Sequence, residues 1–204
     1  MLTREIEYHP HGQTRVLTRG PAPAQAAATL ILLHGRGGSP EDMAKLFESL
    51  KVPQTAAIIP EAANRSWYPR SFLAPQEDNE PYLSSALLRI ETLASALERQ
   101  NIPRHKLVLL GFSQGACLAS EFVARSSVRY GALIALSGGI IGPPGAPATR
   151  QDPHQMRSLQ GMPIFLGSGS HDAHVPQSRV EETAQFLETG APPYTCECIQ
   201  ICRT

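Results

Sequence analysis

The sequence predicts an α/β fold with a mostly parallel sheet and helices on both of its faces. Short apolar runs alternate with amphipathic segments along the chain of 204 residues. Most of these apolar runs are unbroken, which is typical of strands buried on both faces of a parallel sheet. Parallel neighbours need a crossover, usually a helix, so the alternation favours βαβ units. The chain shows no internal repeat and no linker, and we expect one domain over 1–204.

Four apolar runs in the first part of the chain are predicted as strands. Residues 5–9 and 14–18 flank the turn formers Pro-His-Gly, so we expect two strands joined by a turn. Residues 29–35 form an unbroken apolar run that ends on glycine, and residues 55–60 form another. Both of these later runs are typical of buried strands.

Two helices are predicted in the same part of the chain. The first covers 39–50, because Ser39 suits the N-cap, Pro40 suits the first helical position and acidic residues fill the first turn. A loop over 61–79 contains the only tryptophan. The second helix covers 80–100 and carries an apolar stripe on one face. The stripe consists of Leu83, Leu87, Ile90, Leu93, Ala94 and Leu97.

The second half of the chain continues the alternation of strands and helices. Apolar runs again predict the strands, and amphipathic segments predict the helices, the last of which ends at Gly190. The expected strands are 106–110, 131–136, 162–169 and 194–201, and the expected helices are 114–125 and 176–190. A loop rich in proline and glycine covers 138–148.

Composition and charge exclude several classes of protein. Hydrophobic residues make up 42% and charged residues 18%, as in a globular chain and not in a disordered one. Lys plus Arg equals Asp plus Glu at 18 each, so we expect no nucleic-acid partner. No segment approaches the ~18 apolar residues of a membrane span. Residues 1–12 lack the apolar core of a signal peptide, and we expect a cytoplasmic protein.

The four cysteines predict neither a metal site nor a disulfide framework. Cys117 lies at the start of an expected helix, where we interpret it as a small core residue. Cys196, Cys198 and Cys202 crowd together near residue 204. Their C-x-C-x3-C spacing, without a nearby histidine, does not match the usual zinc motifs, so we expect no metal.

Ser113 is the candidate nucleophile. The sequence Gly-Phe-Ser-Gln-Gly follows a buried strand and opens a helix, and this G-x-S-x-G pattern suits a strained strand-to-helix turn. Gly111 and Gly115 remove side chains that would collide where the chain folds back. The N-terminus of the following helix favours negative charge near Ser113, and the backbone N–H of Gln114 is a candidate oxyanion donor. The alternative is a tight turn without chemistry.

A glycine-rich turn over 32–39 supplies the second candidate oxyanion donor. Such a turn brings backbone N–H groups near a nucleophile on a neighbouring strand, and we choose the N–H of Arg36. We interpret His34 as a packed turn residue that hydrogen-bonds the loop, because a catalytic base is expected late in the chain. A nucleotide-binding loop would need G-x4-G-K-[ST], which this turn does not provide.

Asp172 is the candidate for the carboxylate that orients a catalytic base. It lies in the loop after the strand predicted over 162–169, and the chain order on this kind of scaffold is serine, acid, histidine. Asp152 is a weaker candidate, because it does not follow a strong strand. The alternative for Asp172 is a solvated loop residue.

Together these motifs resemble the phospholipase/carboxylesterase family, which includes the acyl-protein thioesterases. The matching stretches are LLHGRGGSPEDM, SWYPRSF, LVLLGFSQGA, LSGGI and GSGSHDAHVP. The resemblance implies an α/β-hydrolase fold with little or no cap. It also implies a serine esterase for short- to medium-chain acyl esters, without a cofactor. In this role Ser113 is the nucleophile, Asp172 the acid, and the amides of Arg36 and Gln114 the oxyanion hole.

Three aromatic residues of the 61–79 loop are candidates for substrate binding. They are Trp67, Tyr68 and Phe72, which lie in one of the stretches that match the family. Two interpretations stay open, because these rings either wall the acyl pocket or pin the loop.

The catalytic histidine is where the sequence departs from the family. The family carries it in a motif like YPGMGH, well after the acid and before a final helix. Here the last histidine is His174, whose ring would rarely reach between its neighbour Asp172 and Ser113. We therefore expect a weak esterase, with His174 or a partner chain's histidine as alternative bases. The competing interpretation is a non-catalytic relative that only binds small acyl ligands.

The tail over 191–204 is atypical, and a shifted reading frame is our hypothesis for it. Starting from the third base of the Thr195 codon, the genetic code permits Leu-Arg-Val-His-Pro-Asp-Met-Pro-His, which resembles the family motif. Sequencing the gene tests this idea. The family's final helix would then be missing and apolar sheet surface uncovered, so we expect a homodimer.

Overall fold

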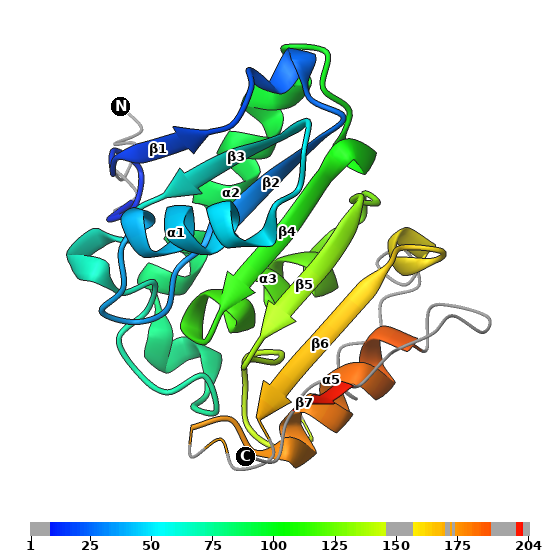
Figure 1. Ribbon diagram of the computed structural model, residues 1–204. Coiled ribbons are helices and arrows are strands. Elements are labelled where there is room, and N and C mark those ends of the chain that lie inside the picture. Colours follow the sequence, from blue (N-terminus) through cyan, green and yellow to red (C-terminus); the bar gives the residue numbers. More distant parts are fainter. Residues whose placement is uncertain (1–8, 146–156, 170–171, 173, 189–198, 202–204) are drawn as a thin grey trace, which may run out of the picture.

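The computed structural model describes residues 9–145, 157–169, 172, 174–188 and 199–201, and its central feature is a seven-stranded sheet (Figure 1). The strand order is β1-β3-β2-β4-β5-β6-β7. β1 runs antiparallel to β3, and every other neighbouring pair is parallel. The strands are β1 (Val16–Arg19), β2 (Ala28–Leu33), β3 (Thr55–Pro60), β4 (Leu107–Phe112), β5 (Ala132–Leu136), β6 (Ile164–Gly169) and β7 (Ile199–Ile201).

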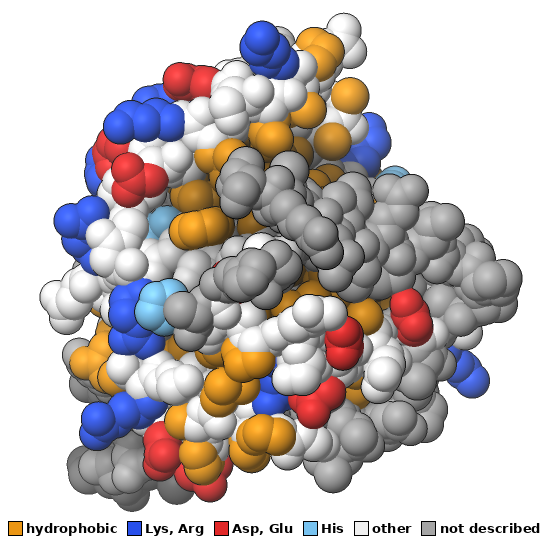
Figure 2. Space-filling model, turned by 60° about the horizontal axis from the view of Figure 1, so that its bottom comes forward, with side chains coloured by type: hydrophobic (Ala, Val, Ile, Leu, Met, Phe, Trp, Pro, Cys, Tyr) orange, Lys and Arg blue, Asp and Glu red, His pale blue; other side chains and the backbone are white. Residues whose placement is uncertain are grey.

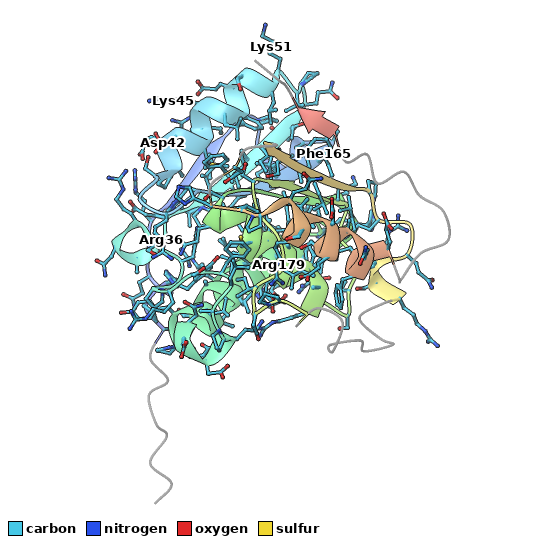
Figure 3. All side chains as sticks on the ribbon, turned by 90° about the horizontal axis from the view of Figure 1, so that it is seen from below. Arg36, Asp42, Lys45, Lys51, Phe165 and Arg179 are labelled. Carbon is cyan, nitrogen blue, oxygen red and sulfur yellow. The ribbon has the colours of Figure 1, made fainter. Side chains whose placement is uncertain are left out.

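Helices cover both faces of this sheet. The α-helices are α1 (Pro40–Leu50), α2 (Tyr82–Glu98), α3 (Gln114–Arg125) and α5 (Gln177–Glu188). The short 3-10 helices are η1 (Pro23–Gln25), η2 (Ala63–Arg65), η3 (Gln76–Asn79) and η4 (Arg104–Lys106). Seen from the carboxyl ends of the strands, α1 lies on one side of the sheet and α2, α3 and α5 on the other (Figure 3). The predicted α/β architecture is therefore confirmed.

Two hydrophobic layers hold the helices to the sheet. The smaller one packs Met43, Ala44 and Phe47 of α1 against β2, β3 and Leu110 of β4. The larger one joins α2, α3 and α5 to the opposite face and includes the predicted stripe of α2. Four members of that stripe are buried, and Leu87 and Leu93 are partly buried against the same cluster. Burial of these apolar side chains is the main force that fixes the helices on the sheet.

α1 begins where the sequence predicts. The Ser39 hydroxyl accepts a hydrogen bond from the Asp42 amide at 3.3 Å, and an Asp42 carboxylate oxygen accepts one from the Ser39 amide at 2.9 Å. This reciprocal capping box satisfies two donors that the first turn would otherwise leave unpaired. The start of α1 directly follows the glycine-rich turn, so the cap also fixes one end of that turn.

Several element boundaries differ from the expectation by one to three residues. β1 begins at Val16 and not at residue 14, and α2 begins at Tyr82 and not at residue 80. Pro81 is the N-cap residue of α2. Most of the strand expected over 5–9 and the part of the tail over 194–198 lie outside the described residues. The remainder of the tail strand forms β7, which pairs with β6 from Gly167 to Gly169.

The α1 side of the sheet carries a row of apolar side chains that are only half-buried. Ile134 of β5 pairs with Phe165 of β6, and both are partly exposed (Phe165 is labelled in Figure 3). Leu136 is also half-buried, and its neighbour Phe112 is 48% exposed. Within the described part of the chain, α1 therefore covers the β2–β3 half of this face more completely than the β5–β6 half.

Candidate active site

Ser113 lies in a strained turn at the carboxyl end of β4. Its backbone has φ 52° and ψ −116°, a conformation that costs a non-glycine residue about 1–3 kcal/mol. The Ser113 amide donates to the Leu136 carbonyl of β5 at 2.8 Å, which holds the turn against the neighbouring strand. Ser113 is half-exposed and directly precedes α3. The turn thus presents the hydroxyl at the N-terminus of a helix, where negative charge is favoured.

Gly111 and Gly115 permit this turn because the backbone approaches itself closely at both. A Cβ added at Gly111 would lie 2.2 Å from the Gly115 carbonyl oxygen. A Cβ added at Gly115 would lie 2.2 Å from the Leu33 carbonyl oxygen of β2. Both distances are far inside van der Waals contact, so the G-x-S-x-G spacing reflects a steric requirement.

The glycine-rich turn after β2 lies beside Ser113. A Cβ at Gly35 would sit 3.4 Å from the Ser113 Cβ, so the backbone that leads to Arg36 passes close to the serine. The Arg36 side chain donates to the Pro69 carbonyl at 2.9 Å and to the Arg70 carbonyl at 2.6 Å. Arg36 therefore ties the turn to the 61–79 loop (Figure 3). The oxyanion role of its backbone N–H stays a prediction.

The Gln114 side chain ties the same loop to the start of α3. Its Oε1 accepts from the Trp67 amide at 2.9 Å, and its Nε2 donates to the Tyr68 carbonyl at 2.7 Å. Gln114 is buried, so both contacts replace water that the loop backbone would otherwise need. Gln114 is also a candidate oxyanion donor through its backbone N–H. Its side-chain contacts therefore fix the position of that N–H.

Asp172 lies beyond the end of β6 with its carboxylate held by backbone amides. One oxygen accepts from the amides of His174 and Val175 at 2.9 Å and 3.0 Å, and the Ser137 hydroxyl is a further donor. Partial burial raises the pKa of Asp172, but these donors outweigh it and leave the pKa below its ordinary value. Asp172 is therefore ionised at neutral pH, as a carboxylate that orients a base must be.

The end of β5 links Ser113 to Asp172. Ser113 donates its amide to Leu136, and the next residue, Ser137, contacts the Asp172 carboxylate. Ser137 has φ 54° and donates its amide to the Gly167 carbonyl of β6. The candidate nucleophile and the candidate acid thus lie at the ends of strands on either side of β5, both at the carboxyl edge of the sheet, where open α/β sheets bind ligands.

The histidines of the described part of the chain differ in burial and in the hydrogen bonds that they make. His34 is buried, its Nδ1 donates to the Gly35 carbonyl and its Nε2 accepts from the Ala62 amide, which confirms its interpretation as a packed turn residue. His174 is exposed, and its backbone amide donates to the Asp172 carboxylate at 2.9 Å. His154 and His171 lie outside the described residues, as does Asp152.

The three loop aromatics are buried to different depths. Trp67 is fully buried, and its indole N–H donates to the His34 carbonyl at 2.8 Å. Tyr68 is 1% exposed and contacts Cys117 of α3, while Phe72 is 9% exposed. The contacts of Trp67 are those expected of a residue that pins the loop. Whether any of the three also walls an acyl pocket stays a prediction.

Two polar residues near the site were missed by sequence reasoning. Ser137 belongs to the stretch Leu-Ser-Gly-Gly-Ile, and its place directly after a buried strand was the available signal. His11 binds the Trp67 carbonyl through Nε2 at 2.9 Å, a contact 56 residues apart in the chain that no local pattern reveals. Cys117 is buried as predicted, and burial raises the pKa of its thiol to about 11, so it is not a competing nucleophile.

The described residues provide neither a membrane-spanning helix nor a metal-binding cluster. None of the helices in the described ranges combines the length and apolarity that a membrane crossing requires. The same ranges bring together no group of three or more His, Cys, Asp and Glu side chains suited to a metal ion. Cys196, Cys198 and Cys202 are outside these ranges.

Figure 2, which turns the carboxyl edge of the sheet forward, shows hydrophobic side chains interspersed with charged ones on this face.

The mostly parallel sheet and the strained serine turn between β4 and α3 are those of an α/β-hydrolase. The profile of the Phospholipase/Carboxylesterase family matches residues 20–200, and the chain belongs to this family. It is 30% identical over 173 residues to acyl-protein thioesterase 1 of Yarrowia lipolytica, covering 76% of this chain and 73% of the relative.

Solved structures support the same assignment. The crystal structure of a phospholipase/carboxylesterase from Dyadobacter fermentans superposes with a TM-score of 0.79 at 38% identity, covering 87% of this chain and 83% of that one. Acyl-protein thioesterase 2 of Zea mays shares the fold, with a TM-score of 0.70 at 19% identity and 90% of each chain covered. The fold is that of the α/β-hydrolases, and the family is one of carboxylic ester hydrolases.

Proposed function

We propose that this chain is a serine carboxylesterase that hydrolyses short- to medium-chain acyl esters through an acyl-enzyme on Ser113. The observation that carries the proposal is the strained position of Ser113 at the N-terminus of α3, beside the Gly35–Arg36 backbone. Backbone strain of this kind in a non-glycine residue clusters at reactive sites. Membership of the family supports the same reaction.

The proposed chemistry is acyl transfer in two steps. The Ser113 oxygen attacks the ester carbonyl, its proton passes to a base, and the C–O bond to the alcohol breaks as the alcohol takes up a proton. Water then attacks the acyl-serine and releases the acid. The amides of Arg36 and Gln114 donate to the oxyanion in both steps. Tyr68 and Phe72 are the proposed walls of the acyl site, and Trp67 is proposed to pin the loop that carries them. The proposed reaction uses neither a cofactor nor a metal.

The site has no assigned histidine to act as the general base. No histidine follows His174 in the 204 residues, and general acid–base catalysis contributes about 10²–10⁴-fold to such reactions. We propose a slow esterase whose catalysis depends mainly on the oxyanion hole and on binding. The second candidate is a non-catalytic relative that binds small acyl ligands, which the backbone contact between His174 and Asp172 favours.

Replacing Ser113 with alanine is expected to abolish hydrolysis of p-nitrophenyl acetate and p-nitrophenyl butyrate. Alanine removes the attacking oxygen without adding volume at the turn, so folding should be retained. Initial rates of the wild type and of Ser113→Ala, with a thioester substrate in parallel, measure this effect. Equal rates in the two proteins would eliminate the esterase proposal and leave the ligand-binding one.

Replacing Asp172 with asparagine tests whether a histidine couples the acid to Ser113. A coupled triad loses about 10⁴-fold in kcat when its aspartate becomes asparagine. In this chain we expect a loss of less than about tenfold, because Asp172 would have no imidazole to orient. Measured kcat values for both proteins decide the matter, and a loss of about 10³-fold or more would show that His174 or a partner's histidine completes the site.

A homodimer is also proposed. The half-buried apolar row around Ile134, Leu136 and Phe165 supports it, because apolar sheet surface tends to be covered by a partner. Light scattering at micromolar concentration tests it, and the mass of one 22.1 kDa chain would contradict it. The cytoplasmic location stays a prediction, to be tested by cell fractionation.

A further inference from the structure

Two buried histidines from separate elements hold the segment 62–68. His11 lies in the turn that precedes β1, and His34 follows β2. His34 Nε2 accepts from the Ala62 amide and His11 Nδ1 accepts from the Ala63 amide, both at 3.0 Å. Two successive backbone donors of one loop are therefore satisfied by two imidazole rings.

Each ring also donates to a carbonyl, which fixes its tautomer. His34 Nδ1 donates to the Gly35 carbonyl at 2.7 Å, and His11 Nε2 donates to the Trp67 carbonyl at 2.9 Å. A carbonyl oxygen only accepts, so His34 carries its proton on Nδ1 and His11 carries its proton on Nε2. The remaining nitrogen of each ring accepts a hydrogen bond from a backbone amide. A protonated ring has no acceptor nitrogen, so both rings fit this network only when neutral.

Trp67 connects the two histidines to the candidate active site. Its rings lie 5.5 Å from His11 and 5.1 Å from His34, between centroids. The Trp67 indole donates to the His34 carbonyl, and the Trp67 amide donates to Gln114 Oε1. Gln114 in turn carries the proposed oxyanion amide. A continuous set of buried contacts thus runs from the N-terminal turn to the proposed oxyanion hole.

We propose that His11 and His34 are positioning residues that act as a pH-sensitive clamp on the segment 62–68. When both rings are neutral, the clamp holds Trp67 against Gln114 and keeps the oxyanion backbone in place. Protonation of either ring replaces an acceptor with a donor facing an amide N–H, which breaks the clamp and frees the segment. The effect on catalysis rests on the proposed function, whereas the clamp itself does not.

The charged groups around the two rings do not offset the effect of burial. Arg89 of α2 faces His11 and donates to the Gly12 carbonyl at 3.0 Å, and it repels an imidazolium there. Around His34, Glu61 of the stretch after β3 and Asp42 of α1 favour the charged ring, and Arg65 opposes it. The charge of His34 in turn disfavours a charged His11. Burial lowers the pKa of both histidines, and for each it is the largest cause.

The sign of the pH effect follows from these lowered values. Above the ordinary histidine pKa of about 6.5 both rings are neutral in the folded and the unfolded chain. Below it the unfolded chain takes up protons that the folded chain resists, so stability falls as the pH falls. The clamp is therefore intact above about pH 6.5 and opens as the pH drops through the lowered folded-state pKa values.

The fluorescence of Trp67 reports the clamp directly, because Trp67 is the only tryptophan and is fully buried. Emission and acrylamide quenching are recorded from about pH 8 to about pH 5, together with far-UV circular dichroism. We expect a red shift and an increase of about twofold or more in the quenching constant, at a pH below about 6.5, while the circular dichroism is retained. An emission that stays unchanged down to the pH at which the circular dichroism is lost would overturn the proposal, and so would a shift that coincides with that loss.

Matched variants separate the clamp from general acid effects. His11→Asn keeps an acceptor near the Ala63 amide but does not titrate, so the transition should become shallower and shift to lower pH. His105→Asn changes an exposed histidine of η4 and should leave the wild-type transition unchanged. Identical transitions in His11→Asn and in the wild type would contradict the proposal.

The clamp can also be tested on the wild type, so the test does not require a variant to fold. Nitrogen-15 spectra of histidine-labelled protein at neutral pH should show one buried ring protonated on Nδ1 and one on Nε2. Both should titrate below the exposed histidines, and normal titration of all of them would overturn the clamp. Esterase activity without a Trp67 transition would refute only the clamp, whereas a transition without activity would refute only the proposed function.

Discussion

Gly115→Ala is expected to destabilise the folded protein by about 3 kcal/mol or more, at the upper end of overpacking substitutions. The added Cβ would lie 2.2 Å from the Leu33 carbonyl oxygen and 2.6 Å from the His34 carbonyl oxygen. Both atoms belong to the backbone at the end of β2, so no side chain can move aside. Either α3 must separate from β2 or the turn at Ser113 must distort, and in both cases the proposed oxyanion donors move apart. Urea denaturation measures the loss of stability.

Gly37→Ala is the matched control. Gly37 lies in the same glycine-rich turn with φ 74°, but a Cβ there meets nothing within 4 Å. Only the left-handed backbone is penalised, at about 1–2 kcal/mol. A destabilisation of Gly115→Ala no larger than that of Gly37→Ala would show that the close approach of α3 to β2 is not required.

Trp67→Ala is expected to cost about 3–5 kcal/mol of stability, because it leaves a large cavity beneath the loop. Trp67 is fully buried, and its indole N–H also donates to the His34 carbonyl. Removing the ring therefore adds an unsatisfied carbonyl to the lost packing. Thermal and urea unfolding of Trp67→Ala measure the effect, and a loss below about 1 kcal/mol would contradict the anchoring role.

Trp67→Phe distinguishes the two interpretations of this residue. Phenylalanine keeps most of the apolar volume but lacks the indole donor, so a pin should lose stability without a change in substrate preference. A wall of the acyl site should instead show an altered ratio of kcat/KM between acetate and butyrate esters. Given its hydrogen bonds to His11, His34 and Gln114, we expect the first outcome.

The sequence predicts the sheet and the helices well because their signals are local. Ser39, Pro40 and the acidic first turn define the start of α1, and the capping box of the structure is the physical form of that signal. The unbroken apolar runs predict β2 and β3, which are buried between two layers. The strand order follows less directly, since β4 pairs with β2 across more than 70 residues.

Site residues are predictable from the sequence where the backbone geometry admits only one residue type. They are missed where their role depends on contacts between distant parts of the chain. Gly111 and Gly115 mark the turn at Ser113 because no other residue fits, so the motif is visible in the sequence. His11 carries no such mark, because its role depends on a contact with Trp67 that only the folded chain creates. Ser137 depends in the same way on the approach of the Asp172 loop to the end of β5.

The most direct test of the central claim is covalent labelling of Ser113. The wild-type protein is treated with a fluorophosphonate ester, which reacts with activated serines, and the adduct is located by peptide mass spectrometry. Because no histidine is assigned as the base, we expect slow labelling, confined to the peptide that contains Ser113, and no adduct in Ser113→Ala. Labelling of another residue, or no labelling of the folded wild type at any concentration tested, would contradict the assignment of Ser113 as the nucleophile.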